Sequence, residues 1–255
     1  VHINLPFSEP IYNEIESHKW KVKNILPGIP LFDLKEEAVI SFAERWNKYG
    51  KKLLIAGMMN PNKALSHLVN KIAGDPSVVV LSETTSNLNN GCSCPCIDRV
   101  VSTFLPEETD TFKPDLLVTF GGNVVSKMVK EFIRNNKPIE HWNIDPVDYR
   151  MNTYQCLTTG IQTEPIIFFS ELINLIKPQN SNYKKIWRER DSRSELRHKE
   201  FLKNCEFSDL RVFETILKAI PINSHLQLGN STPVRYVQLF KPGKSFVYYS
   251  NRGTS

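Results

Sequence analysis

Residues Ser77-Val78-Val79-Val80-Leu81 decide the fold, because an unbroken apolar run of this length is typical of a strand that is buried on both faces. Two further short strand-like runs lie at residues 52–56 and 115–120. Apolar residues at helical spacing flank the first of these, at Ala38, Val39, Phe42, Ala43 and Trp46 before it and at Ala64, Leu65, Leu68, Val69 and Ile72 after it. Such alternation predicts parallel strands joined by helical crossovers. We therefore expect an α/β fold, a Rossmann-like parallel sheet with helices on both faces.

The same two patterns place the remaining elements of this region. We expect an N-cap at Asn60 with Pro61 at the first helical position, and a long loop over residues 82–95. Further helices are predicted at 97–104, from the Gly121-Gly122-Asn123 turn to residue 132, and at 165–176, with another strand at 139–144.

Composition limits the classes of function. The 255 residues are 40% hydrophobic and carry a net charge of +5, from 32 basic and 27 acidic residues. Much of the charge lies in residues 184–203, where the signs alternate as on a solvated helix face, whereas a nucleic-acid surface needs clustered Lys and Arg. No stretch approaches the roughly 18 apolar residues that cross a bilayer, and no signal peptide is evident. We expect a cytoplasmic protein with no nucleic-acid partner and no transmembrane segment.

The cysteines suggest a metal site at first sight, since Cys92, Cys94 and Cys96 follow a C-x-C-x-C pattern. Zinc sites usually combine two separated C-x-x-C pairs, and no second pair exists here because Cys156 and Cys205 are isolated. We therefore expect reduced loop cysteines and no metal ligand.

The pattern changes after residue 178. A polar break at 178–181 precedes a charged helix from Tyr183, for which the expected apolar anchors are Ile186, Trp187, Leu196 and Phe201. A second α/β unit begins near Phe207, with a helix, a strand at 225–228, a turn, a helix and a strand at 246–249. One strand-helix-strand unit cannot bury its own sheet faces. We therefore expect that the rest of this second domain is missing and that the chain is an excised piece.

Two polar segments each follow a predicted strand of this second unit: Gly229-Asn230-Ser231-Thr232-Pro233-Val234-Arg235 and Tyr249-Ser250-Asn251-Arg252-Gly253-Thr254-Ser255. Ligands of open α/β sheets bind at such carboxyl ends of strands. Ser231 can cap a helix and donate, while Arg235, one turn later, suits a carboxylate, and Arg252 is expected near the same crevice. The alternative is an N-capping serine with a surface arginine in polar loops.

The Gly121-Gly122 turn also follows a predicted strand, but the full G-x-G-x-x-G pattern of dinucleotide sites is absent. Gly121 and Gly122 by themselves predict only a tight turn. A module that binds a nucleotide or an effector in the Rossmann-like cleft remains an alternative.

The two polar segments, G-N-S-x-x-V-R and Y-S-N-R-G-T-S, resemble the start of the cofactor-binding domain in the MenD family, the thiamine-diphosphate synthases of menaquinone biosynthesis. The opening V-H-I-N-L-P-F-S-E-P is similar to the end of that family's pyrimidine-binding domain, and residues 81–88, 97–99 and 120–122 resemble its central domain. The resemblance covers nearly the whole chain. It implies the end of the pyrimidine-binding domain and a linker at 1–25, a central Rossmann-like domain at 26–178, a charged helical connector at 179–206, and the truncated start of the diphosphate-binding domain at 207–255.

This resemblance implies an enzyme, a thiamine-diphosphate-dependent transferase that uses magnesium or manganese. The family decarboxylates 2-oxoglutarate on the cofactor and adds the succinyl carbanion equivalent to isochorismate, in a homodimer or homotetramer. Both substrates carry carboxylates, so arginines at strand ends suit the chemistry. The alternative within the same fold is the central domain of another thiamine-diphosphate enzyme, of the acetolactate or pyruvate decarboxylase group.

The resemblance also assigns substrate-binding residues. Ser231, Arg235 and Arg252 match family positions that hold substrate carboxylates and hydroxyls. Lys127 matches a lysine that the central domain directs toward the same site, whereas Met128 stands where the family commonly has arginine.

For the cofactor, Ser255 and Asn251 match positions near thiamine diphosphate. The family's cofactor-activating glutamate and its metal-binding motif have no counterpart in the chain. We therefore expect no catalytic residue and no metal ligand here, and a chain that alone neither binds the cofactor tightly nor turns over.

Overall fold

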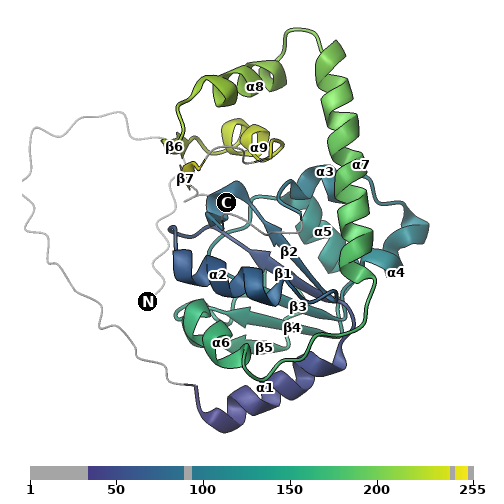
Figure 1. Cartoon of the computed structure of the whole chain (residues 1–255), viewed down its shortest axis with the longest axis vertical. Coiled ribbons are helices and arrows are strands. Elements are labelled where there is room, and N and C mark those ends of the chain that lie inside the picture. Colours follow the sequence, from purple (N-terminus) through teal and green to yellow (C-terminus); the bar gives the residue numbers. More distant parts are fainter. Residues whose placement is uncertain (1–33, 89–93, 242–244, 252–255) are drawn as a thin grey trace, which may run out of the picture. The chain divides into compact units, whose positions relative to one another are not determined.

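A five-stranded parallel sheet organises the larger part of the computed structural model, which describes residues 34–88, 94–241 and 245–251 (Figure 1). Its strands are β1 (Lys52–Ala56), β2 (Val78–Ser82), β3 (Leu116–Phe120), β4 (Glu140–Ile144) and β5 (Thr159–Ile161), in the order β2-β1-β3-β4-β5. Every neighbouring pair is parallel, with Lys52 of β1 in register with Val78 and Leu116. The chain therefore reverses direction across the sheet between β1 and β3, where ligands of such folds usually bind.

Alternate residues of the strands pack against two separate layers of helices. One face, which includes Leu54 and Val80, packs on α1 (Glu36–Lys48), α2 (Lys63–Ile72) and α6 (Pro165–Leu172). The other face, which includes Leu53 and Val79, packs on α3 (Ile97–Val101), α4 (Thr109–Phe112), α5 (Lys127–Asn135) and the first turns of α7 (Tyr183–Asn204). The predicted Rossmann-like sheet with helices on both faces is confirmed. Since both faces are covered, β1, β2 and β3 are buried at every residue, as their predominantly apolar sequences favour.

Several predicted boundaries differ from the observed ones. Asn62, not Asn60, caps α2, because its side chain accepts the Leu65 N–H at 2.9 Å. The predicted helix at 97–104 ends at Val101, and Pro106–Glu108 then forms a short 3-10 turn, η2. The predicted loop at 82–95 opens with a buried 3-10 turn, η1 (Thr84–Ser86). The sequence analysis missed β5, which has only three residues.

Helix α7 leads from this sheet to a smaller two-stranded unit (Figure 1). Trp187 and Ile186 pack on the sheet side as predicted, but Leu196 and Phe201 are exposed, so their prediction as anchors is wrong. The helix instead buries Asp191, Ser194 and Leu202 along its second half. Of these, Asp191 faces the segment between α9 and β7, since it forms an ion pair with Lys241.

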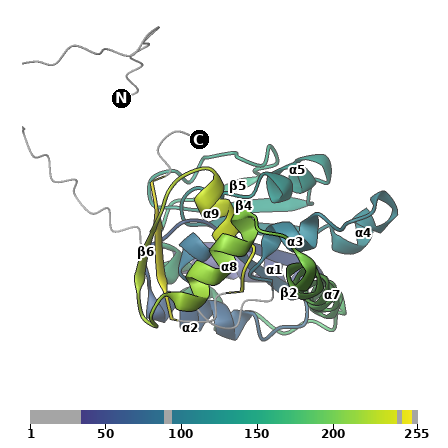
Figure 2. The ribbon, with the colours of Figure 1, turned by 90° about the horizontal axis from the view of Figure 1, so that it is seen from above.

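The smaller unit contains α8 (Asp209–Ala219), β6 (His225–Leu228), α9 (Thr232–Val237) and β7 (Val247–Ser250). Strands β6 and β7 pair in parallel, with Leu228 opposite Ser250. Figure 2 shows α8 and α9 next to each other, where Phe213 stacks on Tyr236 with ring centroids 5.3 Å apart. No helix among the described residues is both long enough and apolar enough to span a membrane.

Candidate functional site

The described parts of the two polar segments, 229–235 and 249–251, lie side by side at the carboxyl ends of β6 and β7. The Asn230 N–H donates to Oδ1 of Asn251 at 3.1 Å, which joins the two loops directly. Ser231, Arg235 and Asn251 are exposed there. Arg252 and Ser255 lie outside the described residues.

Ser231 occupies the N-cap position of α9, as the sequence allows, but its hydroxyl makes no capping hydrogen bond. Its backbone has φ 69° and ψ −120°, a conformation that is rare for a residue with a side chain. Such strain persists only where the surroundings impose it, and it often accompanies functional positions. Because Val234 and Val237 are the buried residues of α9, the intervening Arg235 is left on the exposed side.

The start of α5 is linked through Glu83 to α9, the helix that carries Arg235. Ser126 caps this helix, since its Oγ accepts the Val129 N–H at 3.1 Å, and the same hydroxyl donates to Oδ1 of Asp98. Burial raises the pKa of Asp98, while the hydrogen bond from Ser126 and the nearby positive charge of Arg235 lower it. Lys127 is the exposed first residue of α5, immediately after Ser126. The structure therefore brings the neighbourhoods of Lys127 and Arg235 together, although they are far apart in the sequence.

A buried carboxylate joins α5 to α9. Glu83 follows β2 and is 2% exposed. Its Oε2 accepts the Val125 N–H at 2.6 Å, and its Oε1 accepts the Ser126 N–H at 2.7 Å and Nε2 of Gln238 at 3.4 Å. Its negative charge faces the positive end of the α5 dipole, and charge-assisted bonds of this kind are strong. The sequence analysis missed Glu83, although an acidic residue directly after a strand buried on both faces was a signal for it.

Asn87 joins the larger sheet region to β7. Its Oδ1 accepts the Tyr248 N–H at 2.8 Å, and its Nδ2 donates to the Tyr248 carbonyl at 2.9 Å and to the Met59 carbonyl at 2.8 Å. Asn87 has φ 52°, a left-handed conformation that asparagine tolerates better than most residues. The side chain therefore pairs with β7 as a neighbouring strand would.

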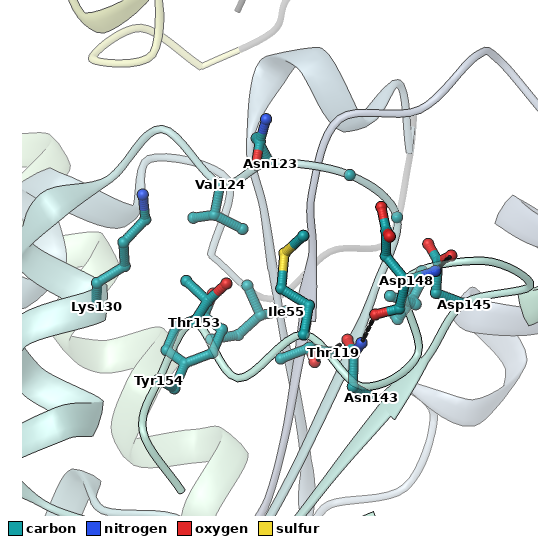
Figure 3. A pocket seen from close by; sticks show the side chains of 14 residues that line it. Ile55, Thr119, Asn123, Val124, Lys130, Asn143, Asp145, Asp148, Thr153 and Tyr154 are labelled. Carbon is teal, nitrogen blue, oxygen red and sulfur yellow. Dashed lines mark hydrogen bonds between the residues drawn. The ribbon is translucent and has the colours of Figure 1, made fainter. Parts of the chain in front are cut away.

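A separate pocket of about 170 Å³ lies at the carboxyl ends of β3 and β4 (Figure 3). Asn143, Asp145 and Asp148 lie on one side of it, and Lys130 and Tyr154 lie on the other. Typical ligand pockets measure roughly 300–1,000 Å³. The pocket is therefore smaller than a typical ligand pocket.

The described cysteines are not arranged for metal binding. Cys94 and Cys96 are buried, and burial raises the pKa of Cys94 well above its ordinary value and that of Cys96 to about 12. Cys156 and Cys205 are half-buried free thiols. Cys92 lies outside the described residues. Within the described ranges, no group of three or more His, Cys, Asp or Glu side chains could hold a metal ion.

Comparison with known proteins gives the class. The family described as "Middle domain of thiamine pyrophosphate" matches residues 32–228. The chain belongs to this family of thiamine-pyrophosphate enzyme middle domains.

Curated relatives are similar to the chain over its whole length. They include proteins named 2-succinyl-5-enolpyruvyl-6-hydroxy-3-cyclohexene-1-carboxylate synthase from Flavobacterium psychrophilum (36% identical), Christiangramia forsetii (38%) and Flavobacterium johnsoniae (36%). Each alignment covers 100% of this chain and 45–46% of the relative. The chain therefore spans about half the length of the curated relatives that it matches.

The described residues fit only part of what a thiamine-diphosphate site requires. Exposed cationic and hydroxyl side chains at strand ends and at a helix start suit anionic groups. The diphosphate of such a cofactor is normally held through a divalent cation with carboxylate and carbonyl ligands. In the part of the chain that the structure describes, no group of three or more His, Cys, Asp or Glu side chains could hold such a cation.

Proposed function

We propose that this chain supplies substrate-binding residues to a 2-succinyl-5-enolpyruvyl-6-hydroxy-3-cyclohexene-1-carboxylate synthase of menaquinone biosynthesis. The enzyme decarboxylates 2-oxoglutarate on thiamine diphosphate and adds the succinyl carbanion equivalent to isochorismate. The names of the relatives support the reaction. The observation that carries the proposal is the hydrogen-bonded link through Glu83 between Ser126, which precedes Lys127, and Gln238, at the end of the helix that carries Arg235.

The proposed residues act by binding and orienting anions. Arg235 pairs with a substrate carboxylate through two parallel N–H donors, and Lys127 adds a point charge at the positive end of α5. Ser231 donates a hydrogen bond from a hydroxyl that no capping bond occupies. Arg252, which follows Asn251 in the sequence, is assigned as a second guanidinium for the substrate, and Ser255 and Asn251 are assigned to cofactor binding. Thiamine diphosphate, when bound, supplies the electron sink for decarboxylation.

The wider assignment follows the same proposal. In this assignment the pyrimidine-binding domain ends within residues 1–25, and the central domain comprises residues 26–178. A helical connector at 179–206 then leads to the start of the diphosphate-binding domain at 207–255. The enzyme uses magnesium or manganese, assembles as a homodimer or homotetramer, and works in the cytoplasm.

The test is an assay of the protein encoded by the whole reading frame that contains this chain, with isochorismate, 2-oxoglutarate, thiamine diphosphate and Mn²⁺. We expect release of CO₂ together with formation of the succinyl adduct. Pyruvate in place of 2-oxoglutarate should give no product. Turnover of pyruvate without the adduct would instead assign a different thiamine-diphosphate enzyme.

In the same assay, Arg235→Ala should lower kcat/KM by about 100-fold, because a substrate carboxylate loses a bidentate charged partner worth about 3 kcal/mol. Arg188→Ala is the matched control, since Arg188 is an exposed arginine on α7. Equal activity of the two variants would remove Arg235 from the site.

A further inference from the structure

We propose that residues 83–87, the 83–87 segment, position the substrate site by holding α5, α9 and β7 in one arrangement. Glu83 holds the first two of these elements, and Asn87 holds the third. The inference rests on the proposed function, because the elements that the segment holds carry Lys127, Ser231, Arg235 and Asn251.

The segment is polar in sequence yet buried throughout. Glu83-Thr84-Thr85-Ser86-Asn87 are between 0% and 7% exposed. The segment is fixed in itself, since Ser86 Oγ donates to the Glu83 carbonyl at 2.7 Å, and it is fixed to the loop after β1, since the Met59 N–H donates to the Thr85 carbonyl at 3.0 Å. Burying a polar side chain costs free energy unless the side chain makes hydrogen bonds inside the protein. Here the two end residues direct their side chains to other elements.

Glu83 needs both of its carboxylate oxygens. Each oxygen accepts one backbone N–H at the start of α5, from Val125 and from Ser126, and one of them also accepts from Gln238. Gln238 is 1% exposed and ends α9, one turn after Arg235. One carboxylate therefore contacts the residue before Lys127 and the helix that carries Arg235. A glutamine of the same shape has one acceptor and one donor, so one of the two N–H groups would face an NH₂ group.

Asn87 needs both ends of its amide. The Val247 N–H bonds to the Ser224 carbonyl on the β6 side, so the peptide groups of Tyr248 point away from β6. Asn87 accepts from one of them and donates to the other. Tyr248 precedes Asn251 by three residues, so this contact sets where the polar loop after β7 begins. An aspartate would keep the acceptor but would place a negative charge against the carbonyls of Tyr248 and Met59.

These requirements predict a kinetic signature in the protein of the whole reading frame. Glu83→Gln and Asn87→Asp should raise KM for the anionic substrates and lower kcat/KM by about 10- to 100-fold, since misplacement by about 1 Å can have such an effect. A purely structural role would reduce the concentration of active enzyme, and hence kcat, without changing KM. Asn62→Ala is the matched control, because it removes an asparagine hydrogen bond at the exposed cap of α2, which is none of the three elements that the segment holds.

Amide hydrogen exchange on the 255-residue chain tests the positioning without any assay of activity. In Asn87→Gly, which retains the left-handed backbone, the Tyr248 N–H should exchange at least about tenfold faster, whereas Asn62→Ala should leave it unchanged. Unchanged exchange at Tyr248 in Asn87→Gly, or unchanged KM in both 83–87 variants of an active enzyme, would overturn the inference. A wild-type protein that makes no product would overturn the proposed function alone, and the exchange result would then decide whether the segment positions these elements.

Discussion

The five-stranded sheet region and the two-stranded unit differ in how they are stabilised. In the first, β1, β2 and β3 are buried at every residue between two helical layers. In the second, β6 alternates between exposed and half-buried residues, and α8 has no buried residue. The candidate residues Ser231, Arg235 and Asn251 belong to the second region. The comparison shows that a sheet buried on both faces can hold a less buried unit, which carries the candidate residues, and low burial of this kind is common around binding sites.

The largest expected effect comes from the core of the first region. Trp142 is fully buried, lies 5.1 Å from Phe42 between ring centroids, and donates from Nε1 to Glu140 at 2.7 Å. Trp142→Ala should lower the free energy of unfolding by about 3–5 kcal/mol, because it leaves a cavity. Urea denaturation followed by circular dichroism measures this. A loss below about 1 kcal/mol would contradict the view that this core dominates stability.

The contribution of the buried side chain of Lys52 to stability is expected to depend on pH. Lys52 begins β1 and is fully buried, with Nζ 2.6 Å from the Tyr49 carbonyl and 3.8 Å from Asp75. Burial lowers its pKa from 10.5 to about 8, against the attraction of Asp75. Below pH 8 the lysine is protonated in both states, so the folded state carries the full cost of a buried charge. Between about pH 8 and 10.5 the unfolded chain binds more protons, so this contribution to stability rises with pH, by up to about 3 kcal/mol.

Other groups titrate with the opposite sign in the same range. Burial raises the pKa of Cys156 to about 11, so its contribution to stability is lost as the pH rises from 9 through that value. The difference in unfolding free energy between wild type and Lys52→Met cancels such terms. We expect the free energy of unfolding of wild type to rise relative to that of Lys52→Met between pH 7.5 and 9.5, as measured by urea denaturation. A difference that is constant with pH would show that Lys52 has an ordinary pKa.

The smallest effect is expected in the second region. Phe213 of α8 is half-buried and stacks on Tyr236 of α9. Phe213→Ala should cost only about 1–2 kcal/mol, because a half-buried ring loses less than a core ring. We expect faster amide exchange in 209–219 and unchanged exchange in β1 and β3. Equal acceleration in both regions would mean that they unfold as one unit.

The sequence predicted the sheet region well because its signals are local. The three valines at 78–80 and the runs at 52–56 and 116–120 are buried strands in the structure. Predicted helix boundaries were wrong where two residues were equally suitable as the N-cap, as with Asn60 and Asn62 before α2. The anchors of α7 failed because a charged helix with scattered apolar residues has several possible faces, and the observed face includes Asp191 and Ser194.

The candidate site was only partly predictable. Resemblance and strand-end position drew attention to Ser231, Arg235 and Lys127, which remain predictions as to function. Glu83 and Asn87 were not predicted as site elements, because their partners lie far away in the chain. The hydrophobic periodicity of a sequence indicates local helices and strands, not contacts between residues that are far apart in the chain. A polar segment after a strand is also typical of an ordinary loop.

The bond between Asn87 and Tyr248 joins residues that are 161 positions apart. During synthesis, chains emerge from the amino terminus and domains fold as they are completed. The strands β1 to β5 can therefore pair on the ribosome while the partner of Asn87 has not yet been translated. Until then the amide of Asn87 has no strand to bind, so the arrangement around Arg235 is the last part of the described chain to be completed.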